Sequence, residues 1–350
     1  MSDSAESSGA FAIDLRRLAA WMSDCVPGYE GPLRLEQFSG GQSNPTYRLL
    51  TPGKTYVLRR KPSGALLKGA HAVEREVRVQ RALESFGFPV AHVHALCTDD
   101  AVIGTRFYVM DFIAGRIIWD ATFPGVERQQ RPRYCDAMNE ALAQLHLVDH
   151  RSIGLADYGR IGGYLQRQIN RWSIQYRDDI AAAGRDANLE RLIEWLPAHL
   201  PPGDETRIVH GDFRVDNVIF HPIEPRIVGV LDWELSTLGN PLADFAHHLT
   251  MYRMPPGTVA GLLGADLRAL NIPTEAEYVA AYCRRTGRDE IADLDFYVCF
   301  TMFRLAAIFH GIKGRAARGT ASSARAQDYA AGVGWLAELA WRQTQRTGRK

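Results

Sequence analysis

The residues best suited to chemistry lie in two short segments of the second half of the chain. His210-Gly211-Asp212 is followed, five positions after the aspartate, by Asn217, directly before an apolar run. Leu231-Asp232-Trp233-Glu234 ends the next apolar run, so a hairpin would bring Asn217 and Asp232 together and leave Asp212 in a loop. Phosphoryl transfer needs a carboxylate beside the acceptor hydroxyl and oxygen ligands for the Mg²⁺ that bridges the ATP phosphates. The two segments contain these groups.

The pair of segments resembles the catalytic and metal loops of aminoglycoside-phosphotransferase-type kinases, relatives of the choline kinases within the protein-kinase-like fold. HGDxxxxN is similar to their catalytic loop, and LDWE stands where a protein kinase has DFG. The resemblance extends from about residue 37 to residue 246. It implies that Asp212 is the catalytic base, that Asn217 and Asp232 are Mg²⁺ ligands and that ATP is the phosphoryl donor. If the two segments had no catalytic role, His210-Gly211-Asp212 would be a polar turn and Asp232 an ordinary aspartate at the end of a strand.

A glycine-rich segment lies between two predicted strands, at 33–38 and 47–51. Glycine lets the backbone approach phosphates closely, and successive N–H groups can cradle an anion. Alone the segment fits a plain hairpin turn, and GxGxxG is absent; beside the catalytic motif, the resemblance implies a nucleotide loop. The nucleotide-binding residues implied here are Gly40, Gly41, Gln42, Ser43 and Asn44.

The cation that grips the phosphates is expected on the next strand, at 55–60. Family members often carry a lysine there, paired with a glutamate of the following helix. Strand alternation puts Arg59 and Lys61 on one face. Arg59 aligns best with the family position, with Lys61 as the alternative. An arginine there departs from the family pattern, because its guanidinium is a planar fork and the ammonium of lysine is a point charge. The partner would be Glu76, with Glu74 as the alternative; without function these residues form a solvated surface pair.

Two further segments match the family. Residues 108–113 resemble the interlobe linker, so backbone groups of Asp111 and Ile113 would hydrogen-bond adenine. Asp244, in the Pro-Leu-Ala-Asp-Phe segment, matches an aspartate that braces the catalytic loop, a structural role.

These parts imply an α+β, protein-kinase-like bilobal fold with a small antiparallel-sheet N-lobe and a large helical C-lobe. Residues 1–109 form the N-terminal lobe, 110–114 the interlobe linker and 115–350 the C-terminal lobe with the catalytic and metal loops. Leu242-Ala243-Asp244 is predicted as a turn. Hydrophobic periodicity predicts helices at 11–25, 71–86, 133–148, 161–183, 186–198, 275–286, 292–312 and 322–345, and strands at 33–38, 47–51, 55–60, 93–97, 106–112, 207–210, 215–221 and 227–232.

Composition excludes several classes of protein. The 350 residues carry 41 Lys+Arg and 40 Asp+Glu, a net charge of +1, so no nucleic-acid partner is expected. The five cysteines are widely spaced without CxxC, which disfavours disulfides or structural zinc and suggests a reducing compartment. No targeting segment is recognised and no apolar run approaches the roughly 18 residues of a membrane span. We therefore expect a cytoplasmic protein without a membrane partner; its oligomeric state stays open.

The acceptor is expected to be a small anionic molecule. Residues 301–350 hold nine basic and two acidic side chains, whereas a site for polycationic aminoglycosides should be acidic. The 303–322 stretch and Ser39–Thr46 are similar to the kinase-like domain associated with acyl-CoA dehydrogenases, which implies a hydroxy acid or hydroxyacyl-CoA as acceptor. The residues proposed to contact it are Arg304, Lys313 and Arg318.

Other functions stay open beside this one. A same-fold alternative is an aminoglycoside or choline-type kinase. An alternative of another class is a non-catalytic nucleotide-binding pseudokinase, which the presence of Asp212, Asn217 and Asp232 disfavours. A protein kinase is disfavoured because no Ala-Pro-Glu follows Asp232. Adjacent residues of a helix do not face each other, so His247 and His248 are not expected to bind zinc.

Overall fold

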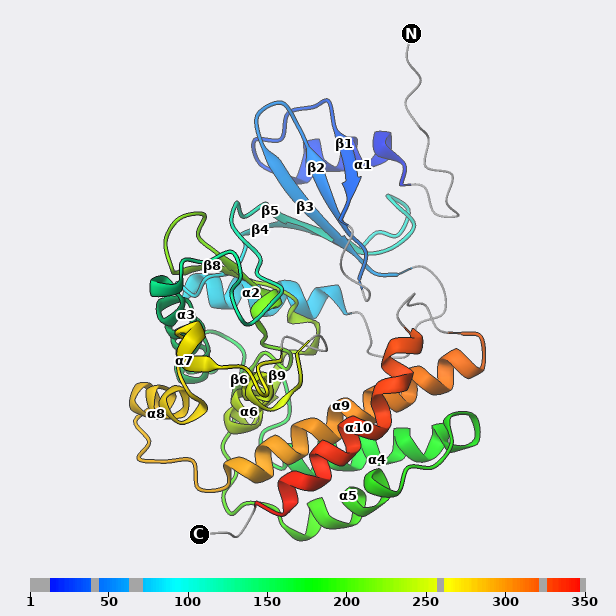
Figure 1. Cartoon of the computed structure of the whole chain (residues 1–350). Helices are drawn as coiled ribbons and strands as arrows, with labels where there is room; N and C mark the ends of the chain where they lie inside the picture. Colours follow the sequence, from blue (N-terminus) through cyan, green and yellow to red (C-terminus); the bar gives the residue numbers. More distant parts are fainter. Residues whose placement is uncertain (1–12, 39–43, 63–71, 257–260, 321–325, 347–350) are drawn as a thin grey trace. The chain divides into compact units, whose positions relative to one another are not determined.

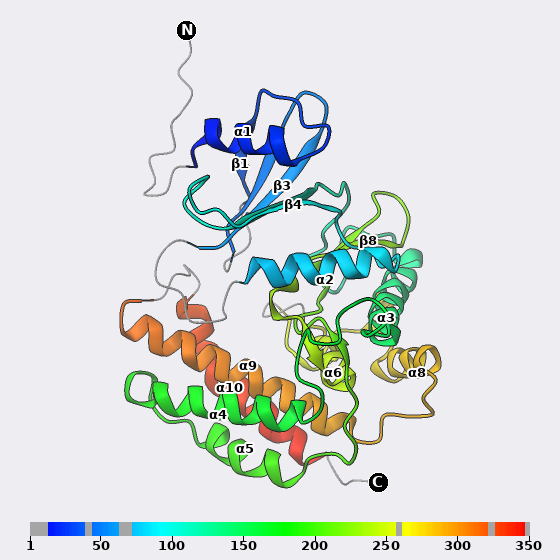
Figure 2. The same cartoon turned by 180° about the vertical axis from the view of Figure 1, so that it is seen from behind.

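The structure, a computed structural model of the chain, describes residues 13–38, 44–62, 72–256, 261–320 and 326–346. The chain divides into two compact units, Met1–Ala114 and Gly115–Lys350. The boundary lies at the end of the predicted 110–114 linker. Figures 1 and 2 show the units from opposite sides.

The N-terminal unit contains a five-stranded antiparallel sheet in the order β1-β2-β3-β5-β4 (Figure 1). All five strands and both helices were expected from the sequence, and the bounds of β3 and β4 are those predicted. The elements are α1 Leu15–Cys25, β1 Arg34–Gln37, β2 Thr46–Leu50, β3 Thr55–Arg60, α2 Val73–Ser85, β4 Val93–Cys97 and β5 Phe107–Asp111.

The two helices of this unit cover opposite faces of the sheet. Successive side chains of a strand point to opposite faces. Tyr56 and Leu58 of β3 therefore join the apolar cluster that includes α1, whereas Val57 joins the cluster that includes α2. Arg59 follows Val57 at the two-residue spacing, which directs it toward α2.

The C-terminal unit is mostly helical (Figure 2). The long helix α9 packs against α4, α6 and α10, and α3 packs against α8. The helices are α3 Arg131–Leu147, α4 Tyr164–Ala183, α5 Ala187–Ala198, α6 Pro241–Arg253, α7 Leu267–Leu270, α8 Glu275–Thr286, α9 Leu294–Ala317 and α10 Ala326–Thr344, and the 3-10 helices are η1 Arg128–Gln130, η2 Val215–Asn217 and η3 Trp233–Leu235.

Two short antiparallel strand pairs interrupt these helices. β6 (Arg207–Val209) pairs with β9 (Thr237–Gly239), and β7 (Val218–Phe220) pairs with β8 (Ile227–Val230). The second pair confirms the hairpin predicted between Asn217 and Asp232. The predicted strand at 215–221 begins three residues later, because Val215–Asn217 is a 3-10 turn.

The turn predicted at 242–244 is wrong, because these residues open the helix α6. Asn240 caps it by accepting hydrogen bonds from the N–H groups of Leu242 and Ala243, and Pro241 stands in its first turn. Every residue of α6 except Leu242 is buried. A helix buried on all sides has no polar face, so it lacks the periodicity by which amphipathic helices are recognised.

One helix meets the length and composition of a membrane span although Arg304 interrupts its apolar residues. The helix α9, Leu294–Ala317, is long and apolar enough to cross a membrane by length and composition alone. In its most apolar window, 78% of the residues are buried inside the protein. A buried core helix passes the same test, so this is weak evidence for a membrane span.

Candidate functional site

The loop between β6 and η2, which carries the predicted catalytic residue, is held by a buried carboxylate of α6. Asp244 accepts hydrogen bonds from the backbone N–H groups of His210 (2.7 Å) and Gly211 (2.8 Å). Nε2 of His146 lies 3.2 Å from the same carboxylate. Burial opposes the charge of Asp244, yet the bonds with His146 and His210 lower its pKa to about 2. These contacts confirm the bracing role predicted for Asp244.

The shape of this loop depends on its histidine and its glycine. Nε2 of His210 donates to the carbonyl of Leu231 at 2.8 Å, since a carbonyl only accepts, and Nδ1 accepts from the N–H of Asp212. The ring thereby ties the loop to the residue before Asp232. Gly211 has φ +85°, and a Cβ there would lie 2.8 Å from the carbonyl oxygen of Leu235. Only glycine fits this position without strain.

Each oxygen of the Asp212 carboxylate has a partner. Oδ1 lies 2.9 Å from Nε2 of His247 and 3.4 Å from Nε of Arg214. Oδ2 accepts from Nδ2 of Asn217 at 3.1 Å. Burial raises the pKa of Asp212, but the charge of Arg214 and the hydrogen bond with His247 hold it well below its usual range. The carboxylate is therefore ionised at neutral pH and able to accept a proton.

The two predicted metal ligands are brought to neighbouring positions of the hairpin. The N–H of Leu231 donates to the carbonyl of Asn217 at 2.8 Å, and Asp232 follows Leu231 directly. Asp232 adopts the left-handed region (φ 64°, ψ 64°), an uncommon conformation for a non-glycine residue. The amide nitrogen of Asn217 faces Asp212, which turns its oxygen away from that carboxylate.

These donors fit Mg²⁺. An amide oxygen and a carboxylate are hard oxygen ligands, and Mg²⁺ takes few protein ligands beside water and phosphate oxygens. Across the described ranges, no three His, Cys, Asp or Glu side chains are grouped to hold a metal ion. Asn217 and Asp232 would thus hold the ion together with water and phosphate oxygens.

Arg214 and Asp216, which the sequence analysis did not select, complete the charges around Asp212. Nη2 of Arg214 lies 3.1 Å from Oδ2 of Asp216. Burial raises the pKa of Asp216, and the charges of Asp212 and Asp232 act in the same direction. The guanidinium of Arg214 thus interacts with the carboxylates of Asp212, Asp216 and Asp232.

In the N-terminal unit, Glu76 of α2 is the centre of a buried polar cluster. Nε of Arg59 lies 2.8 Å from Oε2 of Glu76, and the two side chains are 11% and 2% exposed. Asn44 donates to Oε1 at 2.7 Å, and the hydroxyl of Tyr108 donates to Oε2 at 3.0 Å. Burial and the neighbouring Glu76 raise the pKa of Tyr108 well above its usual range, so the hydroxyl remains a donor. The predicted pairing of Arg59 with Glu76 is confirmed.

The alternative residues form a separate and more exposed group. Nζ of Lys61 lies 3.0 Å from Glu74, which Arg106 also contacts at 2.6 Å. Burial opposes ionisation of Glu74, but its bonds with Arg106 and Lys61 lower its pKa. Arg59 and Lys61 therefore have different glutamate partners.

The remaining nucleotide-binding residues are only partly described. Gly40, Gly41, Gln42 and Ser43 lie outside the described residues, and Asn44, at the end of that segment, is buried against Glu76.

The predicted adenine contacts lie at the end of β5. The N–H of Asp111 donates to the carbonyl of His92 at 2.9 Å. The carboxylate of Asp111 contacts Lys54 and His94 at 2.7 and 2.8 Å. The backbone groups of Asp111 and Ile113 stay the predicted partners of adenine.

Two of the three side chains proposed to contact the acceptor have protein partners. Nη2 of Arg304 on α9 donates to the carbonyl of Gly211 at 2.8 Å, and the residue is buried. Nη2 of Arg318 lies 2.6 Å from Asp179 of α4. Lys313 is half-buried. Arg304 thus supports the catalytic loop from α9, and its contact with an acceptor stays a prediction.

His247 was not predicted as a neighbour of Asp212. It was expected only not to bind zinc beside His248. The signal that could have found it is the three-residue spacing from Asp244, because residues three apart share a helix face. A residue on the same face as the brace of the catalytic loop is expected to reach that loop.

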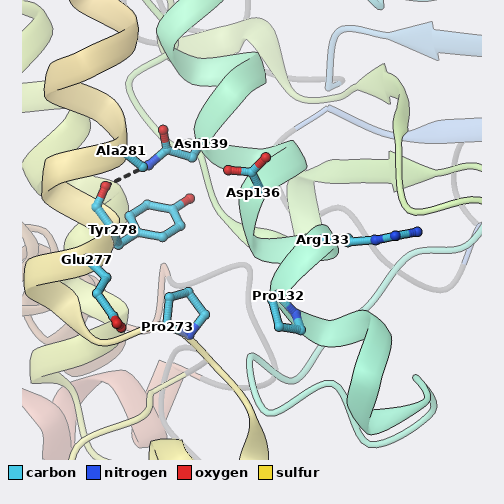
Figure 3. Close-up of a pocket in the computed structure, with 8 residues that line it drawn as sticks. All are labelled: Pro132, Arg133, Asp136, Asn139, Pro273, Glu277, Tyr278 and Ala281. Carbon is cyan, nitrogen blue, oxygen red and sulfur yellow. Dashed lines mark hydrogen bonds between the residues drawn. The ribbon is translucent and has the colours of Figure 1, made fainter.

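A pocket of about 360 Å³ lies between α3 and α8 (Figure 3). In it, Nδ2 of Asn139 donates to the carbonyl of Tyr278 at 2.9 Å. None of the residues predicted for the functional site lines this pocket. Its lining residues are Pro132, Arg133, Asp136, Asn139, Pro273, Glu277, Tyr278 and Ala281.

The sequence is similar to parts of longer proteins. Residues 34–297 match the Phosphotransferase enzyme family, APH. Acyl-CoA dehydrogenase family member 10 of Mus musculus is 45% identical over 313 residues, which cover 89% of this chain and 29% of that protein. Acyl-CoA dehydrogenase family member 11 of Gallus gallus is 43% identical over 338 residues, covering 93% and 43%. The chain thus spans less than half the length of these relatives.

Solved structures share the fold. A Ralstonia eutropha protein, provisionally named an aminoglycoside phosphotransferase, superposes with a TM-score of 0.87 and 46% identity over 97% of this chain and 100% of that one. Spectinomycin phosphotransferase, solved with ADP and spectinomycin, gives a TM-score of 0.62 at 14% identity over 95% and 99%, a likeness of fold alone.

The α+β kinase-like fold is therefore confirmed. The chain belongs to the APH phosphotransferase family of small-molecule kinases, and its relatives include the kinase-like part of acyl-CoA dehydrogenase family members 10 and 11.

Proposed function

We propose that the chain is an ATP- and Mg²⁺-dependent kinase that phosphorylates the alcohol hydroxyl of a small anionic acceptor, a hydroxy acid or a hydroxyacyl-CoA. The observation that carries the proposal is the Asp212 carboxylate, ionised and held between His247 and Asn217, directly beside the proposed metal ligands. A kinase needs an ionised carboxylate to accept the proton of the acceptor hydroxyl. The carboxylate must also be held in place, because positioning and electrostatics supply most of the rate of phosphoryl transfer.

Each of the site residues has a separate role in the proposed reaction. Asp212 orients the acceptor hydroxyl and takes its proton. Asn217 and Asp232 hold Mg²⁺, which when bound neutralises charge on the phosphates. Arg59, fixed by Glu76, grips a phosphate with its planar fork. The ADP bound to spectinomycin phosphotransferase supports an adenine nucleotide as donor.

The acceptor is inferred from the relatives. Two proteins named as acyl-CoA dehydrogenase family members are 45% and 43% identical to this chain over most of its length. A kinase region within such proteins suggests an acceptor of the same chemical class, an acyl thioester that bears a hydroxyl. Such an acceptor is anionic, in agreement with the basic C-terminal segment.

The test is a screen for phosphoryl transfer with Mg²⁺ and ATP, followed by mass spectrometry of the acceptor. Hydroxyacyl-CoAs and free hydroxy acids are compared with choline and aminoglycosides. The wild-type chain should phosphorylate a hydroxyacyl-CoA or a hydroxy acid, and Asp212→Asn should lose turnover by about 10²-fold or more while still binding nucleotide. Retained turnover in Asp212→Asn would overturn the assignment of the base.

An aminoglycoside kinase is the second candidate, because the Ralstonia eutropha protein of that provisional name is 46% identical over nearly the whole chain. Cells that express the chain should then grow at raised aminoglycoside concentrations. Transfer to an aminoglycoside, with none to any hydroxy acid or hydroxyacyl-CoA, would replace the anionic acceptor by this one.

A further inference from the structure

A histidine with no part in the proposed reaction contacts the proposed base. His247 of α6 has a side chain that is 3% exposed, and its Nε2 lies 2.9 Å from Oδ1 of Asp212. A carboxylate oxygen of an ionised aspartate only accepts, so Nε2 is the donor. His247 stands three residues after Asp244 on the same helix face. One face of α6 therefore holds both the backbone and the base of the catalytic loop.

The contact distinguishes the two oxygens of Asp212. Oδ1 receives the hydrogen bond from His247 and also lies 3.4 Å from Nε of Arg214. Oδ2 receives one hydrogen bond, from Nδ2 of Asn217. Each carboxylate oxygen has two lone pairs. Oδ1 thus receives a hydrogen bond from His247 and faces the positive charge of Arg214, whereas Oδ2 receives one hydrogen bond and retains a lone pair for a further donor.

We propose that His247 is a positioning residue for the catalytic base: its bond to Oδ1 fixes the carboxylate so that Oδ2 receives the proton of the acceptor hydroxyl. The proposal rests on the proposed function. In the transfer, the acceptor oxygen bonds to the γ-phosphorus while the bond from that phosphorus to the ADP oxygen breaks, and the hydroxyl proton passes to Oδ2. His247 keeps its Nε2 proton throughout.

The other ring nitrogen of His247 does not account for a histidine at this position. Nδ1 of His247 is buried and has no hydrogen-bond partner among the described residues. An unpaired buried polar atom is destabilising, and an apolar side chain of similar size would avoid this cost. The bond from Nε2 to Asp212 is the interaction that only a donor at this position provides.

The kinetic test compares His247→Leu, which removes the donor, with His247→Gln, which keeps an N–H donor. His310 is the control, since it is also a buried histidine and its Nε2 lies 2.8 Å from the carbonyl of Gly184. With the acceptor found in the screen, His247→Leu should lower kcat about 10²-fold with the KM for ATP within about 2-fold, and His247→Gln should recover to within about 10-fold of wild type. His310→Leu should stay near wild type.

Two kinetic outcomes would overturn the proposal. One is a kcat for His247→Leu equal to that of His310→Leu. The other is a His247→Gln enzyme as impaired as His247→Leu, because the N–H donor would then be irrelevant.

A second measurement does not depend on turnover. ¹⁵N spectra of the histidine rings in the full wild-type chain, assigned with His247→Gln, report which ring nitrogen carries a proton. A protonated Nε2 of His247 is expected, and a bare Nε2 would contradict the proposal. A wild-type chain that phosphorylates nothing would instead contradict the proposed function, so the two failures are distinguishable.

Discussion

The carboxylate of Asp244 accepts a hydrogen bond of 2.7 Å from the backbone N–H of His210, a residue 34 positions earlier in the chain. It accepts another from Gly211, and both donors belong to the segment that leads into Asp212. Two backbone bonds to one buried carboxylate fix the direction in which the loop leaves β6. The orientation of Asp212 thus depends on a residue that itself has no role in the proposed chemistry.

Replacement of Asp244 by alanine should destabilise the protein and abolish turnover. The N–H groups of His210 and Gly211 would be left buried without an acceptor, at a cost of about 1–3 kcal/mol each. Thermal unfolding should show a Tm lower by several degrees. Asp136→Ala is the control, because Asp136 forms a pair with Arg285 while 58% exposed, and such pairs contribute about 0–1 kcal/mol. A Tm equal to that of Asp136→Ala would contradict this role.

The stabilisation by Asp244 should depend on pH in the acid range. Its pKa is lowered from 3.8 to about 2 in the folded protein, so the unfolded chain binds the proton more readily. The stabilisation is therefore fully present above about pH 4 and is lost as the pH falls toward 2. Urea unfolding at pH 6, 4 and 3 measures the free energy of unfolding of wild type and of Asp244→Asn. The difference between the two free energies should be smallest at pH 3. A constant difference would contradict the lowered pKa.

Gly211→Ala should impair the loop more than the same change at another glycine of similar conformation. Gly211 has φ +85°, and the added Cβ would lie 2.8 Å from a backbone oxygen of Leu235. Gly264 has φ +81° with nothing within 4 Å, so Gly264→Ala carries only the backbone cost of about 1 kcal/mol. Gly211→Ala should have the lower Tm and a kcat reduced at least about 10-fold. Equal Tm and kcat values in the two variants would contradict the close approach.

Elements with a clear periodicity were predictable from the sequence, whereas the helix α6, buried on all sides, was not. The amphipathic helix Glu275–Thr286 has the bounds that were predicted, because its caps and its polar face are both present in the sequence. The helix Pro241–Arg253 was missed because burial on all sides removes the polar face. His247 was considered on a helix only beside His248, so its position three residues after Asp244 and its contact with Asp212 were not predicted.

Charge along the sequence does not show which partner Arg304 has in the fold. Its position in a basic segment suggested contact with an anionic acceptor, yet its guanidinium is buried on the carbonyl of Gly211. A count of charges along the sequence does not distinguish an arginine that binds a buried carbonyl from one that faces solvent. Arg59, in contrast, was paired correctly with Glu76, as the resemblance to the family implied.

Arg59 and Lys61 can be separated as ligands of the phosphates. Arg59 is fixed by Glu76 in a buried pair, whereas Lys61 contacts the more exposed Glu74. Arg59→Ala should raise the KM for ATP about 10- to 100-fold through loss of a charge-assisted bond, and Lys61→Ala should change it less than about 2-fold. Arg59→Lys should recover only part of the loss, because an ammonium lacks the planar fork. A larger effect of Lys61→Ala would transfer the role to Lys61.

Asp232→Asn should remove the stabilisation of the protein by Mg²⁺ and ATP. Asparagine tolerates the left-handed backbone of Asp232, so this variant removes the charge and keeps the shape. In thermal-shift titrations, Mg²⁺ and ATP at about 100 times the Kd should raise the free energy of unfolding of the wild type by about 2.7 kcal/mol. This raises its Tm by several degrees. The gain should need Mg²⁺ and should vanish in Asp232→Asn but not in the surface control Asp136→Asn. Two outcomes would contradict Asp232 as a metal ligand. One is an undiminished stabilisation of Asp232→Asn by Mg²⁺ and ATP, and the other is the same stabilisation of the wild type with chelator present. Nucleotide binding would then be independent of the ion that Asp232 is expected to hold.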